Sequence, residues 1–200
     1  MSKKLWSLKF NTATLVLIPA AIGINYLGKL FASLLKLPLW LDAIGTCLAA
    51  VLGGPIIGAV CGAVNNIIYG LTLDPISTVY ALTNIGIGIV VGILAYKGFM
   101  KNLKGAILTG IIVGIVAVII STPLNIYYWG GTTGNVWGDA LYAWAVSQNM
   151  PMWLASGLDE LVVDVPDKLA VVILVFIIQK SLPKNLLNLF HNNEEVESLD

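Results

Sequence analysis

Residues 43–73 read AIGTCLAAVLGGPIIGAVCGAVNNIIYGLTL, and none of these 31 residues carries a charge. A helix needs about 20 apolar residues to cross the hydrocarbon core of a bilayer. The stretch is interrupted by a Gly-Gly-Pro sequence at residues 53–55, and such a sequence breaks a helix. The stretch therefore predicts two short apolar helices, at about 39–52 and 55–72, with a re-entrant hairpin as the alternative.

The composition of the whole chain agrees with a membrane location. Apolar residues make up 58% of the 200 residues and charged residues 11%, whereas soluble proteins have roughly 45–50% and about 25%. So few charges exclude a soluble globular domain, a disordered chain and a nucleic-acid-binding protein with a basic face. We therefore expect an all-α integral membrane protein that crosses the bilayer several times and has no nucleic-acid partner.

Other mainly apolar stretches place the remaining spans, at about 13–35, 75–96, 105–128 and 154–179. Together with the two short helices they predict a six-transmembrane-helix bundle. This membrane domain would occupy residues 1–190, and a disordered cytoplasmic tail would follow at 191–200. The segment 129–152 is rich in Gly, Trp and Asn, so it is expected to form a loop with one short amphipathic helix.

The lysines predict the orientation, because loops on the cytoplasmic side of a membrane carry an excess of Lys and Arg. All 11 cationic residues are lysines. Eight of them fall on one predicted side: Lys3, Lys4, Lys9, Lys97, Lys101, Lys104, Lys180 and Lys184. Lys29 and Lys36 are expected in an outer loop, and Lys168 lies inside the last span. Both termini are therefore predicted to be cytoplasmic.

With this orientation, polar residues from five or six spans fall at one depth, in the outer half of the bundle. They include Asn25, Asp42, Thr46, Asn65, Asn66, Tyr69, Thr83, Asn84, Ser121, Thr122, Asn125, Asp159, Glu160 and Asp164. Such groups are costly in hydrocarbon unless they face protein or water. They predict a polar pocket that opens to the outside. Hydrogen bonds between helices without any ligand are the alternative.

Aromatic residues of the expected outer loops add to this pocket. Trp129 and Trp137 flank the Gly-rich segment 130–135, which would suit a lid over a stacked ligand. Trp40 is a similar candidate in the first outer loop, two residues before Asp42. An aromatic belt at the membrane interface is the alternative explanation for each of them.

The last span carries charges at membrane depth. Asp164 and Lys168 are four residues apart, with the acid on the N-terminal side, which is a favourable spacing for an ion pair. The pair is either purely structural, or Asp164 contacts a ligand and Lys168 supports it. Asp159 and Glu160 lie nearer the outside and are the better candidates for direct contact.

The candidate substrate-binding residues are Trp40, Asp42, Asn66, Asn84, Asn125, Trp129, Trp137, Asp159, Glu160 and Asp164. No catalytic residue, metal ligand or cofactor is predicted. The single histidine, His191, lies in the tail, and Cys47 and Cys61 are expected to be buried free thiols in apolar segments. The chain also lacks the Gly-x-x-x-x-Gly-Lys-Ser/Thr motif of nucleotide-binding loops.

Several stretches resemble the substrate-binding S components of energy-coupling factor (ECF) transporters. They are LDAIGTCLAA at 41–50, GGPIIGAVCGAVNNIIYG at 53–70, Asp74-Pro75, NIGIG at 84–88, WGGTTG at 129–134 and DVPDK at 164–168. The resemblance covers most of residues 10–190. It implies a multi-pass protein of the prokaryotic plasma membrane that captures a vitamin or related micronutrient from outside.

The resemblance also implies partners. An S component has no ATPase of its own and docks on a membrane coupling protein that carries two cytoplasmic ATPase subunits. In the family, docking is associated with a stripe of small residues in the first span. Here that span has Ala13, Ala20, Ala21 and Gly23 without a clean repeat, so the docking face is not assigned.

The substrate stays open. Several carboxylates and one deep lysine favour a neutral or amine-bearing ligand over an anion, but pyridoxine-like, thiamine-precursor-like and pantothenate-like ligands all fit. Two other functions are also open: a stand-alone secondary transporter, and an intramembrane aspartyl hydrolase that pairs Asp42 with Asp159 or Asp164. Uptake by this chain alone would support the transporter, and loss of turnover in Asp42→Asn would support the hydrolase.

Overall fold

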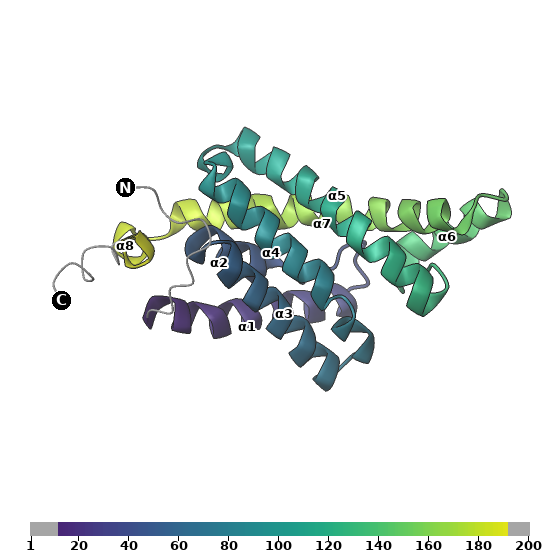
Figure 1. The fold of residues 1–200 in the computed structure, drawn as a ribbon, viewed down its shortest axis with the longest axis horizontal. Helices are drawn as coiled ribbons and strands as arrows, with labels where there is room; N and C mark the ends of the chain where they lie inside the picture. The colour runs from purple at the N-terminus through teal and green to yellow at the C-terminus, as the bar shows by residue number, and fades with distance from the viewer. Residues whose placement is uncertain (1–11, 192–200) are drawn as a thin grey trace.

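The computed structural model describes residues 12–191, and the regular elements in this range are all helices (Figure 1). Its α-helices are α1 (Thr12–Leu34), α2 (Ile44–Gly53), α3 (Pro55–Thr72), α4 (Ala81–Tyr96), α5 (Leu103–Trp129), α6 (Val136–Ser147), α7 (Met152–Ser181) and α8 (Lys184–His191). Two 3-10 turns, η1 (Pro75–Thr78) and η2 (Phe99–Lys101), precede α4 and α5. The all-α class predicted from the sequence is thus confirmed.

Six of these helices, α1 to α5 and α7, match the six predicted segments, and α6 is the predicted short helix of the outer loop. Two boundaries were wrong. Helix α2 begins at Ile44 and not near residue 39, so Trp40 and Asp42 lie in a loop and not in a helical turn. The segment predicted at 75–96 is divided, because Asp74 caps the separate turn η1 through the backbone N–H of Ile76. Helix α8 was not expected.

Helices α1, α3 and α5 are each long and apolar enough to cross a membrane, and α2 and α4 are shorter apolar helices. The 10 residues of α2 span about 15 Å, which is half of the roughly 30 Å hydrocarbon core. Helix α7 has 30 residues but carries charged residues in its middle. The number of helices that cross the bilayer therefore stays a prediction.

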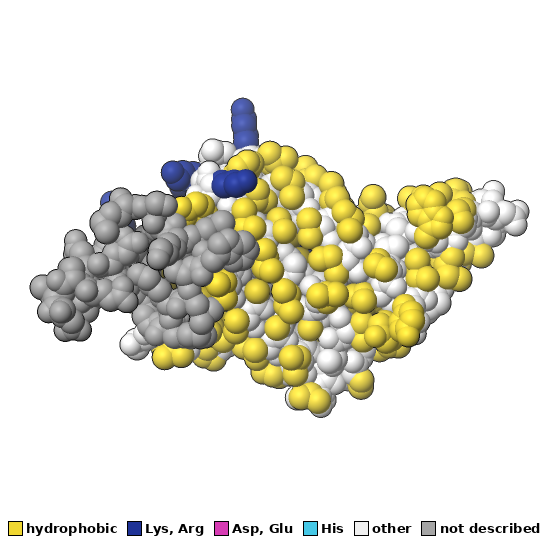
Figure 2. All heavy atoms as spheres, in the orientation of Figure 1, with side chains coloured by type: hydrophobic (Ala, Val, Ile, Leu, Met, Phe, Trp, Pro, Cys, Tyr) yellow, Lys and Arg dark blue, Asp and Glu magenta, His cyan; other side chains and the backbone are white. Residues whose placement is uncertain are grey.

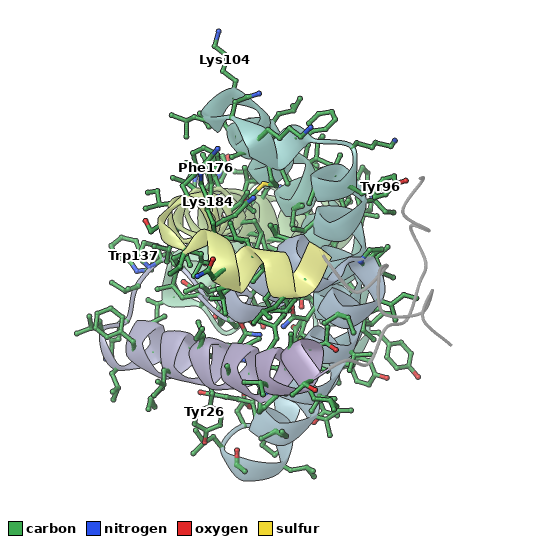
Figure 3. The ribbon with its side chains drawn as sticks, turned by 90° about the vertical axis from the view of Figure 1, so that its left-hand side faces the viewer. Tyr26, Tyr96, Lys104, Trp137, Phe176 and Lys184 are labelled. Atoms are coloured by element: carbon green, nitrogen blue, oxygen red, sulfur yellow. The ribbon has the colours of Figure 1, made fainter. Side chains whose placement is uncertain are left out.

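The predicted cytoplasmic and outer segments lie at opposite ends of the molecule. The turn at 97–104 and α8 occupy one end, and α6 lies at the other (Figure 1). Lysine side chains gather at the first end of the visible face (Figure 2), and in the view onto this end Lys104 points away from the protein (Figure 3). Lys3, Lys4, Lys9 and the predicted tail at 192–200 fall outside the described residues. Which end faces the cytoplasm stays a prediction.

Apolar side chains cover much of the surface, while polar side chains are buried. Helix α5 exposes a row of isoleucines, at positions 107, 111, 115 and 119, and apolar atoms cover most of the face in Figure 2. In contrast, Asn25, Asn125 and Asp159 have no exposed surface. This distribution is the reverse of that in a water-soluble protein and suits a lipid environment.

Glycines allow the helices of the bundle to approach closely. A Cβ atom on Gly88 of α4 would lie 2.4 Å from the carbonyl carbon of Gly58 on α3. One on Gly114 of α5 would lie 2.8 Å from the Cα of Val165 on α7. These small residues therefore pack helices within the bundle. Cys47 and Cys61 are buried and free, as predicted.

Candidate functional site

A cavity lies where α1, the α1–α2 loop, η1, α4, α5 and α7 meet. The space in and above it measures about 540 Å³, including its opening to solvent. It is lined by Lys29, Trp40, Asp42, Asp74, Ile76, Ser77, Tyr80, Thr83, Asn84, Ile87, Ser121, Thr133, Glu160, Asp164 and Lys168. Of the 14 polar residues predicted at one depth, six thus line one cavity: Asp42, Thr83, Asn84, Ser121, Glu160 and Asp164.

Five of the predicted substrate-binding residues line this cavity: Trp40, Asp42, Asn84, Glu160 and Asp164. Asn66 and Asn125 do not line it but are buried behind residues that do. Trp129, Trp137 and Asp159 are also outside the lining. Trp137 has 59% of its surface exposed and donates its indole N–H to the carbonyl oxygen of Lys36 at 3.2 Å. Its observed contact is therefore with the α1–α2 loop.

Lys168 is the centre of a buried ion cluster. Its Nζ lies 2.5 Å from Asp167 Oδ2, 3.4 Å from Asp164 Oδ1 and 3.5 Å from Asp42 Oδ1. The pair of Asp164 with Lys168 was predicted from its spacing and is confirmed. The contacts of Lys168 with Asp42 and Asp167 were not foreseen. Because buried charges need opposite partners, the cluster ties the α1–α2 loop to α7.

The α1–α2 loop, residues 35–43, is held from two sides. Asp167 Oδ1 accepts the backbone N–H groups of Trp40 and Leu41, at 3.1 and 2.9 Å. From α6, Asn135 donates to the carbonyl oxygen of Leu37 at 3.3 Å, next to the bond from Trp137. Leu41 has a φ of +53°, a left-handed conformation that is unfavourable for leucine. These contacts place the side chains of Trp40 and Asp42 in the cavity wall.

The start of α2 depends on a side chain from α1. The N-cap residue Ala43 has no side-chain oxygen that could accept a hydrogen bond. Instead, Asn25 Oδ1 accepts the backbone N–H groups of Gly45 and Thr46, at 2.6 and 3.3 Å, and its Nδ2 donates to Thr46 Oγ1 at 2.8 Å. A capping group satisfies N–H groups that would otherwise lack acceptors. Asn25 thus fixes where the loop ends.

Lys29 belongs to α1 and lines the cavity, which corrects its prediction as an outer-loop lysine. Its Nζ donates to Ser77 Oγ at 2.6 Å and lies 4.5 Å from the centre of the Tyr69 ring. Ser77 Oγ in turn donates to Asp74 Oδ2 at 2.8 Å. The hydroxyl group of Ser77 therefore links the positive charge of Lys29 to the negative charge of Asp74.

A chain of amides lies behind the cavity. Asn66 Nδ2 donates to the carbonyl oxygen of Ser77 at 3.0 Å, and Asn66 Oδ1 accepts from Asn84 Nδ2 at 2.8 Å and from Asn65 Nδ2 at 3.1 Å. On the opposite wall, Tyr80 Oη donates to Asn125 Oδ1, and Asn125 Nδ2 donates to Glu160 Oε1 at 2.5 Å. Asn66 and Asn125 therefore orient cavity residues.

The glycine-rich segment 130–135 reaches the cavity through Thr133 alone. Asp139 Oδ1 accepts the backbone N–H groups of Thr133 and Gly134, at 3.0 and 3.1 Å. Thr133 Oγ1 donates to Asp159 Oδ1 at 3.0 Å. Asp159 therefore supports the segment from α7, outside the lining. The proposed lid over a stacked ligand stays a prediction.

Sequence reasoning left Ser77, Tyr80 and Thr133 out of the candidate set, although all three line the cavity. One available signal was Asp74-Pro75, since Asp at an N-cap followed by Pro marks the start of a helical turn. That turn carries Ser77. The orientation of Tyr80 and Thr133 depends on long-range packing, which no local pattern reports.

The sequence model of the family described as "ECF transporter, substrate-specific component" matches residues 12–191. The chain belongs to this family, as its motifs suggested. No curated protein and no solved structure matches the chain. Membership of the family, together with the apolar helices, makes the chain a multi-pass membrane protein and the substrate-binding component of an ECF transporter.

Proposed function

We propose that the cavity beside Lys168 is the substrate site, and that it captures a vitamin or related water-soluble micronutrient from outside a prokaryotic cell. The observation that carries this proposal is the open cavity lined by carboxylate, ammonium, amide and hydroxyl groups. Polar and charged groups are costly at membrane depth unless they serve one another or a ligand. Here acidic, amide and hydroxyl groups from separate helices converge on one space.

The proposal includes partners. The chain would hand its substrate to a membrane coupling protein that carries two cytoplasmic ATPase subunits. In support, neither the sequence nor the family assigns an ATPase to this chain. Uptake into liposomes should therefore need the coupling protein and ATP. Uptake by this chain alone would contradict the assignment and favour a stand-alone transporter.

Tryptophan fluorescence offers a direct test, because Trp40 is the tryptophan that lines the cavity among those described. The purified full-length protein is titrated with B vitamins and nucleobases. We expect one of them to give a saturable fluorescence change. A flat response to every compound would contradict the proposal.

Two variants test which tryptophan gives the fluorescence change. Trp40→Phe should lose most of the fluorescence change, while Trp144→Phe should retain it. Trp144 is on α6, has 52% of its surface exposed and is outside the cavity. Loss of the signal in Trp144→Phe together with its retention in Trp40→Phe would place the substrate elsewhere.

A further inference from the structure

We propose that the cavity selects a cationic ligand with an N–H group, held between the amide oxygen of Asn84 and the carboxylates of Glu160 and Asp164. This inference rests on the proposed function of the cavity as a substrate site. It names the chemical class of the substrate as an amine or an amine-bearing heteroaromatic cation. Three independent features of the lining support it.

The first feature is an acceptor without a donor. The bond from Asn66 Nδ2 to the Ser77 carbonyl fixes the orientation of the Asn66 amide, so Asn66 Oδ1 must accept from Asn84 Nδ2. Asn84 Nδ2 also donates to the carbonyl oxygen of Asp42 at 3.3 Å. Asn84 Oδ1 is then left as a buried acceptor with no hydrogen-bond donor. Asn84 is 3% exposed and lines the cavity, and a ligand N–H group that reaches Asn84 Oδ1 would supply the missing donor.

The second feature is a pair of neighbouring acids. Glu160 and Asp164 are four residues apart on α7, which places them on one face, and both line the cavity. Their exposed fractions are 2% and 3%, so water screens them little. The cation nearest to Asp164 is Lys168, which also serves Asp42 and Asp167. A positive group on the ligand would stabilise negative charge on both acids.

The third feature is the shortage of free cations for an anionic ligand. The chain has no arginine, the residue best suited to bind a carboxylate or phosphate. The two lysines of the lining are already engaged: Lys168 by three carboxylates, and Lys29 by Ser77 and the ring of Tyr69. In addition, the aromatic side chains of Trp40 and Tyr80 line the cavity and can attract a cation to their faces.

The experiment measures affinities of the full-length protein in detergent by calorimetry. The probes are two cations, thiamine and pyridoxamine, two neutral compounds, pyridoxine and nicotinamide, and two anions, pantothenate and biotin. Pyridoxamine and pyridoxine form a matched pair that differs in an amine against a hydroxyl group. We expect a cation to bind at least about tenfold more tightly than every neutral or anionic probe. A tenfold difference in affinity corresponds to the free energy of about one hydrogen bond to a charged group.

Substitution of Glu160 tests the charge itself. Glu160→Gln keeps the shape and the acceptor for Asn125 but removes the charge, and it should weaken binding of the cation roughly 10- to 100-fold. Glu160→Asp keeps the charge and should retain more affinity than Glu160→Gln. Mass spectrometry of molecules that copurify with the wild-type protein needs no variant, and it should detect an amine-bearing compound.

The results separate the two proposals. Tightest binding by a neutral or anionic probe, or a copurified anion, would overturn the charge assignment and leave the substrate-binding function standing. The charge assignment would also be overturned if folded Glu160→Gln binds the cation with an affinity within about twofold of wild type. Loss of a charge that contacts the ligand should lower the affinity by more than about twofold. If no probe and no copurified molecule binds the wild-type protein, the substrate site itself fails, and the inference fails with it.

Discussion

Lys168 is the residue on which the cavity wall depends most. It is 2% exposed and has three carboxylates within 3.5 Å. Removal of one partner from a buried ion pair leaves an uncompensated charge, which costs more than the pair contributes. Among the described residues, no other cation forms an ion pair with the three acids beside Lys168, so they lose their partner if it is replaced.

The variant Lys168→Met should therefore lower the free energy of unfolding by about 3–5 kcal/mol. Asp167→Asn should cost less, because an asparagine oxygen can still accept the N–H groups of Trp40 and Leu41 while Lys168 keeps two acids. Chemical unfolding in mixed micelles measures both. The exposed Lys101→Met is the control, with an expected change within about 0.5 kcal/mol. Equal stability of Lys168→Met and Lys101→Met would refute the structural role.

At the scale of elements, the contact between α3 and α4 depends on the absence of side chains. A Cβ on Gly88 would meet backbone atoms of Gly58 and Ala59 at 2.4 to 2.6 Å. Backbone atoms cannot rotate away as a flexible side chain can. The two helices must therefore separate if Gly88 is enlarged.

Gly88→Ala should consequently destabilise the protein by about 1–3 kcal/mol, the usual cost of overpacking. The matched control is Gly157→Ala on α7, where an added Cβ meets no atom within 4 Å. This control should be neutral, or more stable by about 0.5–1 kcal/mol, since alanine favours a helix over glycine. Thermal unfolding of both variants tests the difference. Equal melting temperatures would show that α3 and α4 do not pack as described.

The elements also show what the sequence could predict. Mainly apolar stretches located six helices, because hydrophobicity along the chain is a local property. The start of α2 was misplaced by five residues, since residues 39–43 are held in a loop by Asp167, more than 120 positions away. Asp42, Glu160 and Asp164 were found because charges at membrane depth are conspicuous. Tyr80 and Thr133 were missed because helix rotation and loop docking depend on the whole bundle.

At the scale of the whole molecule, the orientation in the membrane can be tested with single cysteines. The native Cys47 and Cys61 have no exposed surface, so they should give little background with a maleimide that does not cross membranes. Lys101 belongs to η2 and Ser147 to α6, two elements at opposite ends of the molecule, and both residues are exposed. With the lysine-rich end in the cytoplasm, Ser147→Cys should react in intact cells and Lys101→Cys only after the cells are permeabilised. The reverse pattern would invert the orientation.

The left-handed backbone of Leu41 has a consequence for the cavity wall. A non-glycine residue in this conformation costs about 1–3 kcal/mol, and it persists only while its surroundings enforce it. Here the two hydrogen bonds to Asp167 provide that enforcement. If these bonds are lost, Leu41 can relax, and the segment that carries Trp40 and Asp42 into the cavity wall relaxes with it.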